Sequence, residues 1–311
     1  MIHLTDVGKD FGGPLARLRR ERVRALDGVS LHVPAGTAVG LVGPNGAGKS
    51  TVIKLLLGYL HPSRGGVEVG GMLPRDYVER HGVSYVPDRV TLPPWWTVRG
   101  ALRTFAALAE VDDWEERVER EMARMELNEV AHRRVRALSK GNLQRLALAQ
   151  ALLADRKVMV LDEPTDGLDP EWVARVREVL AGWRAADPER VLVFASHDLD
   201  EVERVADQVV VLRAGRVHEV LATAGEGPVP SWTLVVEGTE SARLVEKAFP
   251  GALPLTGEAH AFRVEAGSAR DVSRRVQTLL ERGGVVRALT PGGGSLRERY
   301  RAMGARRRGP A

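Results

Sequence analysis

Short apolar runs alternate with helical patterns along the first two thirds of the chain. Continuous apolar strands separated by helices are typical of a mostly parallel sheet covered on both faces. The candidate core strands are 38–42, 83–86, 158–161, 191–195 and 209–212. The pattern therefore predicts an α/β fold built on a mostly parallel core sheet.

The alternation is interrupted in two places. Between residues 88 and 155 the strands stop, and segment 101–131 has the spacing of charged amphipathic helices. This predicts a helical subdomain inserted into the α/β core. Near 221–231 the chain becomes rich in Gly and Pro and loses its periodicity, which predicts a domain boundary. The expected division is a first domain at 1–221, a linker at 222–231, a second domain at 232–303 and a flexible basic tail at 304–311.

Beyond the boundary, the predicted elements follow the order βαββαβ. They are strand 233–236, helix 241–249, strands near 252–255 and 261–264, helix 268–282 and strand 285–289. The second helix is supported by one apolar stripe, formed by Val272, Val276, Leu279 and Leu280. The order predicts a small α+β domain of the ferredoxin-like type.

Composition narrows the class of protein. A chain of 311 residues is long enough for two domains, and 44% hydrophobic with 28% charged residues is typical of a soluble globular protein. No apolar run approaches the roughly 18 residues of a membrane span, and the N-terminus lacks a secretory pattern, so we expect a cytoplasmic chain. The absence of Cys excludes disulfides and thiolate chemistry. A net charge of +4 is too small to indicate nucleic-acid binding, and no specific nucleic acid is expected as a partner.

The segment GPNGAGKST, 43–51, follows a predicted core strand and precedes an apolar helical run. It contains Gly43-x-x-x-x-Gly48-Lys49-Ser50, the phosphate-binding loop pattern. Its glycines let backbone N–H groups surround phosphates, Lys49 reaches the β- and γ-phosphates, and Ser50 ligates Mg²⁺. A plain Gly-rich turn would not require a lysine, a hydroxyl and both flanking elements in register. The segment therefore predicts a site for a nucleoside triphosphate with Mg²⁺.

Two carboxylates stand at the end of a later apolar strand. Strand 158–161 is followed directly by Asp162 and Glu163. In a phosphate-binding site, this is where an acceptor in the outer coordination sphere of Mg²⁺ and a general base for water are placed. A helix cap for the following segment is the alternative, and the distance from the phosphate-binding loop favours the chemical role.

These motifs, taken together, resemble the nucleotide-binding subunits of ATP-binding-cassette (ABC) transporters, and they follow the family's order from Phe11 to His197. The resemblance implies a P-loop ATPase fold with an antiparallel N-terminal β part, ATP as the nucleotide, and ATP hydrolysis. The implied nucleotide contacts are Phe11, which would stack on adenine, Gly43, Asn45, Gly46, Ala47, Gly48, Lys49, Ser50 and Thr51. The implied Mg²⁺ residues are Ser50, Asp88 and, in the outer sphere, Asp162.

The resemblance also implies a dimer. The segment LSKGN, 138–142, stands where the family has its LSGGQ signature, and Gly167-Leu168-Asp169 resembles the loop that crosses between subunits. Two copies would face head to tail, each holding ATP between its own phosphate-binding loop and the partner's signature. The signature contacts would come from Ser139, Lys140, Gly141 and Asn142. Glu163 would polarise the attacking water, and His197 would hold water and γ-phosphate in line.

Departures from the family pattern leave several roles open. Asp88 stands where the family has Gln, and it adds a charge that we expect to slow or retune the coupling of ATP hydrolysis without abolishing hydrolysis. Lys140 and Asn142 replace Gly and Gln, and the Lys140 side chain either serves the phosphate or points to solvent. The alternatives to a site role are a core aromatic for Phe11, helix N-caps for Ser139 and Asp169, and a structural histidine for His197.

The membrane partner and the direction of transport are inferred from a few residues and from the family resemblance. Trp95 and Trp96 either meet a membrane subunit or pack into the helical subdomain. Transport requires a separate multi-spanning permease, which would hold the chain at the cytoplasmic face of the cell membrane. The LSKG-type signature and the C-terminal domain resemble bacterial exporters, where that domain would support the dimer. The rival functions are a soluble ABC ATPase that remodels a macromolecular complex and an ATP sensor with little hydrolysis.

Overall fold

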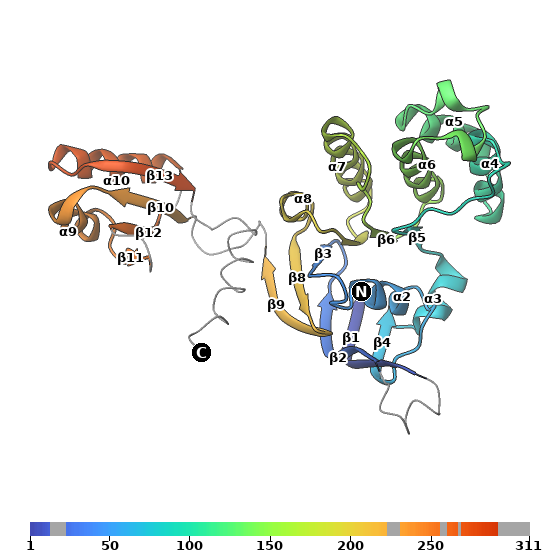
Figure 1. The fold of residues 1–311 in the computed structure, drawn as a ribbon, viewed down its shortest axis with the longest axis horizontal. Coiled ribbons are helices and arrows are strands. Elements are labelled where there is room, and N and C mark those ends of the chain that lie inside the picture. The colour runs from blue at the N-terminus through green and yellow to red at the C-terminus, as the bar shows by residue number, and fades with distance from the viewer. Residues whose placement is uncertain (13–22, 223–230, 256–259, 267–268, 292–311) are drawn as a thin grey trace. The chain divides into compact units, whose positions relative to one another are not determined.

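The computed structural model describes residues 1–12, 23–222, 231–255, 260–266 and 269–291 (Figure 1). The chain divides into two compact units, Met1–Thr223 and Ala224–Ala311, and each has an apolar core of its own. Most of the predicted linker, and all of the predicted basic tail at 304–311, lie outside the described residues. In the described ranges, no helix is both long enough and apolar enough to cross a membrane.

A six-stranded sheet forms the centre of the first unit. Its strands are β3 (Ala38–Val42), β5 (Ser84–Val86), β6 (Val158–Asp162), β7 (Val191–Ala195), β8 (Gln208–Arg213) and β9 (Arg216–Ala222). The strand order is β5-β6-β7-β3-β8-β9, and every pairing is parallel except the β8–β9 hairpin. β3, β6 and β7 are buried along their whole length, which explains why they are continuous apolar runs in the sequence. The predicted mostly parallel core sheet is confirmed.

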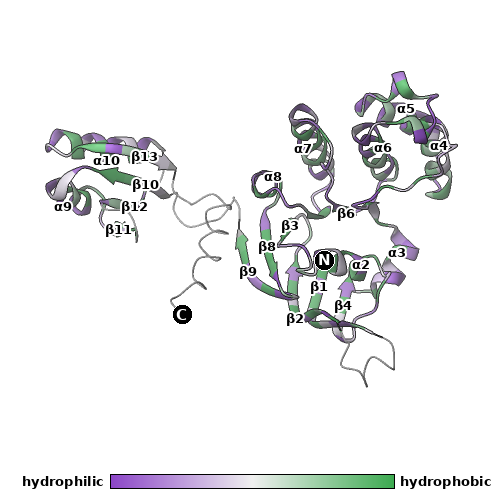
Figure 2. Ribbon diagram, in the orientation of Figure 1, coloured by the Kyte–Doolittle hydropathy of each residue, from purple (hydrophilic) through white to green (hydrophobic). Residues whose placement is uncertain are grey.

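A smaller antiparallel sheet is built mainly from the N-terminal part of the chain. It contains β1 (Ile2–Phe11), β2 (Val23–Val33) and β4 (Arg64–Val69), in the order β2-β1-β4. Apolar side chains of both sheets share one core with helix α2 (Lys49–Leu56), and Leu26, Leu41 and Ile53 belong to it. Figure 2 shows both green hydrophobic and purple hydrophilic stretches on these strands, as expected for elements with one buried face. The shared core fixes α2, and with it the loop that precedes α2.

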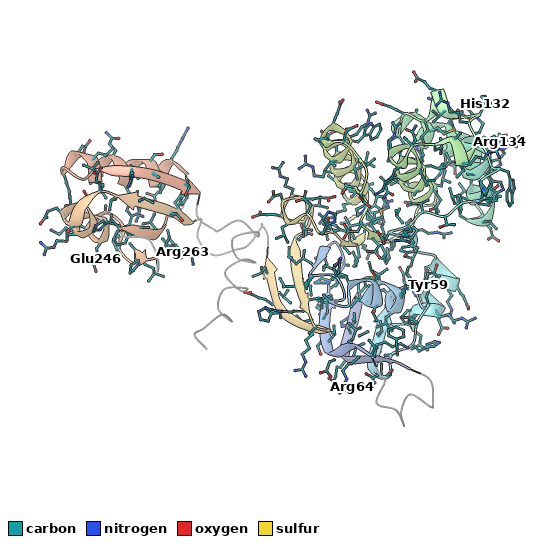
Figure 3. All side chains as sticks on the ribbon, in the orientation of Figure 1. Tyr59, Arg64, His132, Arg134, Glu246 and Arg263 are labelled. Carbon is teal, nitrogen blue, oxygen red and sulfur yellow. The ribbon has the colours of Figure 1, made fainter. Side chains whose placement is uncertain are left out.

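An ion cluster at Asp27 ties the two sheets together. Asp27 on β2 accepts a hydrogen bond of 2.9 Å from Arg64 on β4, which is labelled in Figure 3, and it also pairs with Arg216 on β9. The hydrogen bond from Arg216 holds the pKa of Asp27 below its usual value. Because β9 belongs to the larger sheet, the cluster adds a polar link to the shared apolar core.

Three helices and two 3₁₀ turns pack together beyond β5 and β6 (Figure 1). They are α4 (Val98–Leu108), α5 (Trp114–Arg124), η1 (Asn128–Val130), η2 (Val135–Ala137) and α6 (Lys140–Leu153). Leu102, Met122 and Leu146 are fully buried among them. The sequence predicted helices in this part of the chain, and no strand is found between β5 and β6 in the described residues.

The two adjacent tryptophans before α4 have different surroundings. Trp95 is 68% exposed, whereas Trp96 is partly buried with its ring edge-on to Phe105, 6.1 Å between ring centroids. The sequence left open whether these rings meet a partner or pack into the helices. One ring packs, and the other is exposed in the single chain.

In the described part of this unit, the remaining helices are α3 (Pro74–His81), α7 (Pro170–Ala185) and α8 (Leu199–Val205). α8 packs against β3 and α7, and a Cβ on Gly40 would lie 2.3 Å from the Val202 side chain. The close approach of α8 to β3 therefore requires glycine at position 40. It places α8 next to the strand ends that carry the polar residues described below.

The C-terminal unit has the order βαββαβ. Its elements are β10 (Ser231–Val236), α9 (Gly238–Ala248), β11 (Leu253–Pro254), β12 (Ala261–Glu265), α10 (Ala269–Glu281) and β13 (Val286–Pro291). The sheet order is β11-β12-β10-β13, with antiparallel pairs. Val272 and Leu279 are buried in the core and Val276 packs against it, but Leu280 is 50% exposed. The helix predicted from this apolar stripe is confirmed, and Leu280 lies at the exposed edge of the stripe because Leu279 fills the core-facing position.

Candidate functional site

The loop between β3 and α2 has the conformation of a phosphate cradle. A Cβ on Gly43 would lie 2.3 Å from the Leu212 carbonyl oxygen, so only glycine fits there. Gly48 adopts φ 108° and begins α2 without a side-chain cap. The first N–H groups of α2 therefore have no side-chain partner from the capping position and point to the loop, where an anion would be stabilised. Lys49 donates a hydrogen bond of 2.8 Å from Nζ to the Gly43 carbonyl oxygen, which curls its ammonium group over the same loop.

An open pocket of about 880 Å³ lies at this loop. It is lined by Phe11, Val23, Arg24, Ala25, Asn45, Gly46, Ala47, Gly48, Lys49, Ser50, Thr51, Asp88, Asp162, Glu163, Asp166 and His197. Every predicted nucleotide contact except Gly43 is in this lining, together with all the predicted metal and catalytic residues. The parallel sheet explains the convergence, because β3, β5, β6 and β7 end at the same edge and their following loops meet there.

Asp162 is the buried acid of the pocket. Burial raises its pKa, and the nearby charges of Asp88 and Glu163 act in the same direction, while a hydrogen bond from Ser50 and the charge of Lys49 oppose them. A hydroxyl beside carboxylates offers the hard oxygen donors that Mg²⁺ prefers. The described residues contain no group of three or more His, Cys, Asp or Glu side chains that could hold a metal alone. This donor set fits Mg²⁺ that is completed by phosphate oxygens and water, as is usual for this ion.

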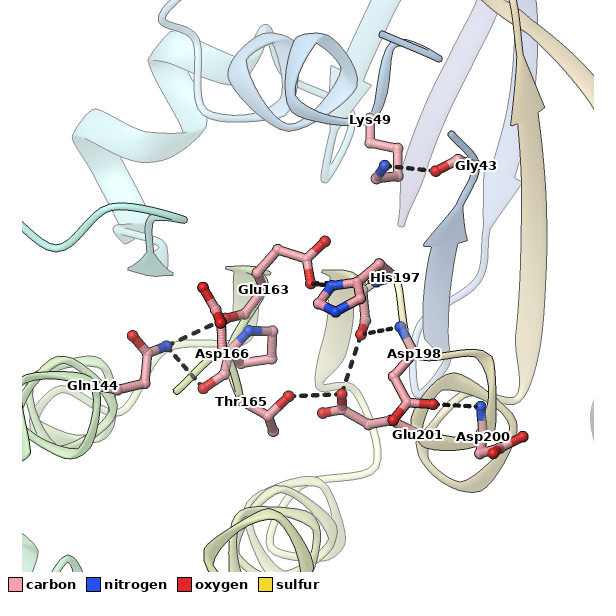
Figure 4. Close-up of polar contacts among 12 residues, drawn as sticks. Gly43, Lys49, Gln144, Glu163, Thr165, Asp166, His197, Asp198, Asp200 and Glu201 are labelled. Atoms are coloured by element: carbon pink, nitrogen blue, oxygen red, sulfur yellow. Dashed lines mark hydrogen bonds and ion pairs between the residues drawn. The ribbon is translucent and has the colours of Figure 1, made fainter. Parts of the chain in front are cut away.

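Glu163 and His197 form a hydrogen-bonded pair at the mouth of the pocket (Figure 4). The His197 Nδ1 lies 2.7 Å from Glu163 Oε2, and the His197 backbone N–H donates to the same oxygen at 3.2 Å. The hydrogen bond raises the pKa of His197. Glu163 has φ 53°, a left-handed conformation that is uncommon for a residue with a side chain. Strained backbone conformations of this kind are typical of functional sites, which is consistent with a functional role for the Glu163 side chain.

The residues of the predicted signature lie at the start of α6. Ser139 accepts a hydrogen bond of 3.2 Å from the Asn142 N–H, so it caps the helix, as the alternative for this residue proposed. Lys140 donates a hydrogen bond of 2.7 Å to Asp166 of the same chain, and its stem lies against Gly167. Within one chain the Lys140 side chain is largely exposed and paired with Asp166, and a contact with the phosphate of a second copy stays a prediction. None of the four signature residues lines the pocket of their own chain.

Asp169 caps α7 in the same way. Its carboxylate accepts a hydrogen bond of 2.9 Å from the Trp172 N–H, and Pro170 follows it as the first helical residue. Helix capping accounts for Asp169 within one chain. A contact of Asp169 with a second subunit stays a prediction. Gly141 would place a Cβ 3.2 Å from the Gly167 carbonyl oxygen, so the segments before α6 and α7 are in close contact.

This chain was compared with protein families and with known proteins. A family model described as "ABC transporter" matches residues 26–166. The Nod factor export ATP-binding protein I of Burkholderia thailandensis is 34% identical over 236 residues, which cover 72% of this chain and 75% of that protein. The chain belongs to the ABC transporter ATP-binding protein family.

Two further similarities show how much of the chain resembles known members of the family. An uncharacterized ABC transporter ATP-binding protein of Nostoc sp. is 36% identical over 202 residues, and the match covers 63% of this chain and 59% of that protein. The chain thus matches less than two thirds of this relative's length. The post-hydrolysis dimer of the ATP-binding cassette MJ0796, bound to ADP and Pi, has a TM-score of 0.66 at 22% identity, covering 73% of this chain and all of that one. This structural likeness supports the ABC cassette fold alone.

Sequence reasoning missed part of the pocket of this ABC cassette. Phe11 is 40% exposed at the pocket edge and pairs across the sheet with Val23, so it is not a core aromatic. Val23, Arg24 and Ala25 line the pocket because β2 pairs with β1 beside the phosphate loop. The family resemblance implied an antiparallel N-terminal β part, but it did not show which residue of β2 pairs with Phe11.

The sequence analysis also missed two buried residues that hydrogen-bond the loops of the site. Gln144 on α6 donates a hydrogen bond of 2.8 Å to the Pro164 carbonyl oxygen, and Glu201 on α8 accepts hydrogen bonds from Thr165 and Ser196. Both side chains are buried polar groups within helices. The only sign in the sequence was a polar residue at an inward-facing helix position, which by itself does not identify a partner.

Proposed function

We propose that the chain binds Mg-ATP in the pocket between β3 and α2 and hydrolyses it, as the ATP-binding subunit of an ABC transporter. The observation that carries this proposal is the convergence of Lys49 and Ser50 with Asp162, Glu163 and His197 on one pocket. A phosphate-binding loop alone would be compatible with nucleotide binding without hydrolysis. A carboxylate and an imidazole opposite the phosphates supply what hydrolysis needs in addition.

Each residue has a definite task in this proposal. Lys49 exchanges the Gly43 carbonyl oxygen for phosphate oxygens, and the N–H groups at the start of α2 bind the same phosphates. Ser50 and Asp88 would hold Mg²⁺, with Asp162 in its outer coordination sphere, and the bound ion would neutralise charge on the phosphates. Glu163 accepts a proton from the attacking water, and His197, which is hydrogen-bonded to Glu163, holds the water and the γ-phosphate in line.

The complete site requires two copies in this proposal. The pocket is open, and the signature residues of the same chain do not line it. Ser139 and Gly141 begin α6, a helix whose N-terminal end can bind the γ-phosphate of a second copy's ATP. Head-to-tail pairing of two copies would place this helix end over the partner's pocket. The dimeric form named for the MJ0796 cassette is consistent with that arrangement.

The transporter itself requires a membrane partner. We infer a separate multi-spanning permease that holds the chain at the cytoplasmic face of the cell membrane and contacts the exposed Trp95. The Burkholderia relative is an ATP-binding protein for Nod factor export, and this supports the exporter direction for this chain as well. Co-purification from native membranes in mild detergent tests this part of the proposal. A multi-spanning protein at equal stoichiometry is expected. Ribosomal or DNA-repair partners would instead indicate an ATPase that remodels a macromolecular complex.

Steady-state hydrolysis of Mg-ATP tests the catalytic part. Wild type is expected to hydrolyse ATP only with Mg²⁺, and Glu163→Gln to lose at least about 100-fold in kcat with little change in ATP binding, because only the base is removed. Glu171→Gln, on the first turn of α7 and outside the pocket lining, is the matched control. Equal activity of wild type and Glu163→Gln would refute the assignment of the base. ATP binding without hydrolysis in wild type would favour a sensor.

A further inference from the structure

A buried carboxylate lies behind the candidate catalytic pair. Glu201 on α8 is 5% exposed, and its Oε2 accepts hydrogen bonds from Thr165 Oγ1 at 2.7 Å and Ser196 Oγ at 3.1 Å. Figure 4 shows this carboxylate between the loop after Glu163 and the loop that carries His197. One oxygen atom therefore joins the two segments that supply the proposed base and its histidine partner.

The backbone explains why such a link is needed. β6 and β7 are paired up to Asp162 and Ala195, and the last bond between them runs from the Glu163 N–H to the Ala195 carbonyl oxygen, 2.9 Å. Among the hydrogen bonds of the described residues, no later backbone bond joins segments 164–168 and 196–198. The bridge from Thr165 through Glu201 to Ser196 continues the connection past the end of the sheet.

The bridge lies next to the proposed catalytic residues in the sequence, but Glu201 itself is outside the pocket. Thr165 is two residues after Glu163, Ser196 directly precedes His197, and Ser196 is 1% exposed. The Ser196 hydroxyl oxygen also accepts the Asp198 N–H at 3.1 Å, which fixes the turn on the other side of His197. Glu201 does not line the pocket. Burial raises the pKa of Glu201, so the hydroxyl donors stabilise a group that would otherwise be costly to enclose.

We propose that Glu201 is a positioning residue for ATP hydrolysis: it holds the loops of Glu163 and His197 in register so that base and imidazole face the same phosphate. The proposal rests on the proposed ATPase function. Loss of the bridge would let the two loops separate, and small displacements of catalytic groups reduce rates strongly. Phosphate binding would be unaffected, because the β3–α2 loop makes no use of Glu201.

Kinetics separate this role from a purely structural one. In Glu201→Ala, kcat is expected to fall by about 10- to 100-fold while the KM for Mg-ATP stays within about 2-fold. Glu201→Gln keeps an oxygen that accepts both hydroxyls, so it should restore kcat to within about 3-fold of wild type. Glu203→Gln, two residues along the same helix, is the matched control. An unchanged kcat in Glu201→Ala, or no rescue by Gln, would overturn the proposal.

Thr165→Val removes one arm of the bridge at nearly constant volume, and it keeps the proposal testable if Glu201→Ala does not fold. It is expected to lower kcat less than Glu201→Ala does and in the same direction. A kcat equal to wild type in Thr165→Val would count against the bridge.

Amide hydrogen exchange without nucleotide provides a readout that does not depend on hydrolysis. Protection of segments 163–168 and 196–198 should fall together by at least about 10-fold in Glu201→Ala and be retained in Glu201→Gln. Unchanged exchange in both segments would overturn the proposal. Joint loss of protection in a chain whose wild type does not hydrolyse ATP would refute the proposed function and leave the bridge supported.

Discussion

Ser139 offers a test that separates helix capping from ligand binding. It begins α6 with φ −67° and ψ 163°, and its Oγ accepts the Asn142 N–H at 3.2 Å. Replacing a serine N-cap by alanine costs roughly 1 kcal/mol of stability, whereas aspartate caps about as well as serine. Ser139→Ala should therefore lower the free energy of unfolding by about 1 kcal/mol, and Ser139→Asp should leave it nearly unchanged.

Activity should rank the same variants in a different order. If Ser139 faces the γ-phosphate of a second copy's ATP, Ser139→Asp places a negative charge against it. Two unit charges about 4 Å apart interact by about 4 kcal/mol at an effective dielectric constant near 20. Half of that value, left after screening and rearrangement, corresponds to roughly a 30-fold loss of kcat/KM. Ser139→Ala loses one neutral hydrogen bond, about 1 kcal/mol or roughly 5-fold.

Urea denaturation and Mg-ATPase activity, measured on the same preparations, supply the two rankings. The expected result is that Ser139→Asp is as stable as wild type but the least active, and that Ser139→Ala is less stable but retains more activity. If activity follows stability, with Ser139→Asp as active as wild type, Ser139 is only a helix cap and the head-to-tail site is wrong.

Three further predictions address the pocket of a single chain. Gly43→Ala should weaken ATP binding by about 5- to 150-fold, measured by calorimetry, because its Cβ would lie 2.3 Å from the Leu212 carbonyl oxygen and the loop must distort at a cost of about 1–3 kcal/mol. Unchanged affinity would show that ATP binding does not need this loop geometry. Asp88→Ala should raise the Mg²⁺ concentration for half-maximal activity by about tenfold, and an unchanged Mg²⁺ dependence and turnover in both Asp88→Ala and Asp88→Gln would exclude a role in metal binding. The hydrogen bond with Glu163 raises the pKa of His197, so protonated His197 stabilises the folded state below the ordinary histidine pKa of about 6.5, and this contribution is lost as the pH rises through the higher folded pKa. Glu163→Gln should lower the pKa of His197, followed by NMR titration, and an unchanged pKa would contradict the pairing.

The parts of the fold that the sequence predicted are those whose physical cause is local. β3, β6 and β7 are enclosed on both faces, so each is an unbroken apolar run that can be recognised without knowing its neighbours. The phosphate-binding loop is contiguous, and its strand, glycines and helix appear in one stretch of sequence. The same holds for the caps at Ser139 and Asp169, where the side chain bonds a backbone group three residues later.

Contacts between distant segments could not be predicted from these patterns. Lys140 pairs with Asp166, and Glu201 bridges Thr165 and Ser196, only because α6, α8 and two strand ends meet in space. Leu280 fits an apolar stripe as well as Leu279 does, and only the packing of the sheet decides which of the two is buried. In each case the decisive quantity is a distance across the fold, which spacing along one element does not contain.

The mass of the Glu163→Gln variant in solution tests the central claim most directly, because blocked hydrolysis should trap two copies around ATP. Light scattering after size exclusion with Mg-ATP is expected to show a dimer of two 33.9 kDa chains, and monomers with Mg-ADP or when Ser139→Asp is added to the variant. A variant that binds Mg-ATP but stays monomeric, or that dimerises equally with ADP and with the Ser139→Asp change, would contradict an ATP site completed by the signature of a second copy.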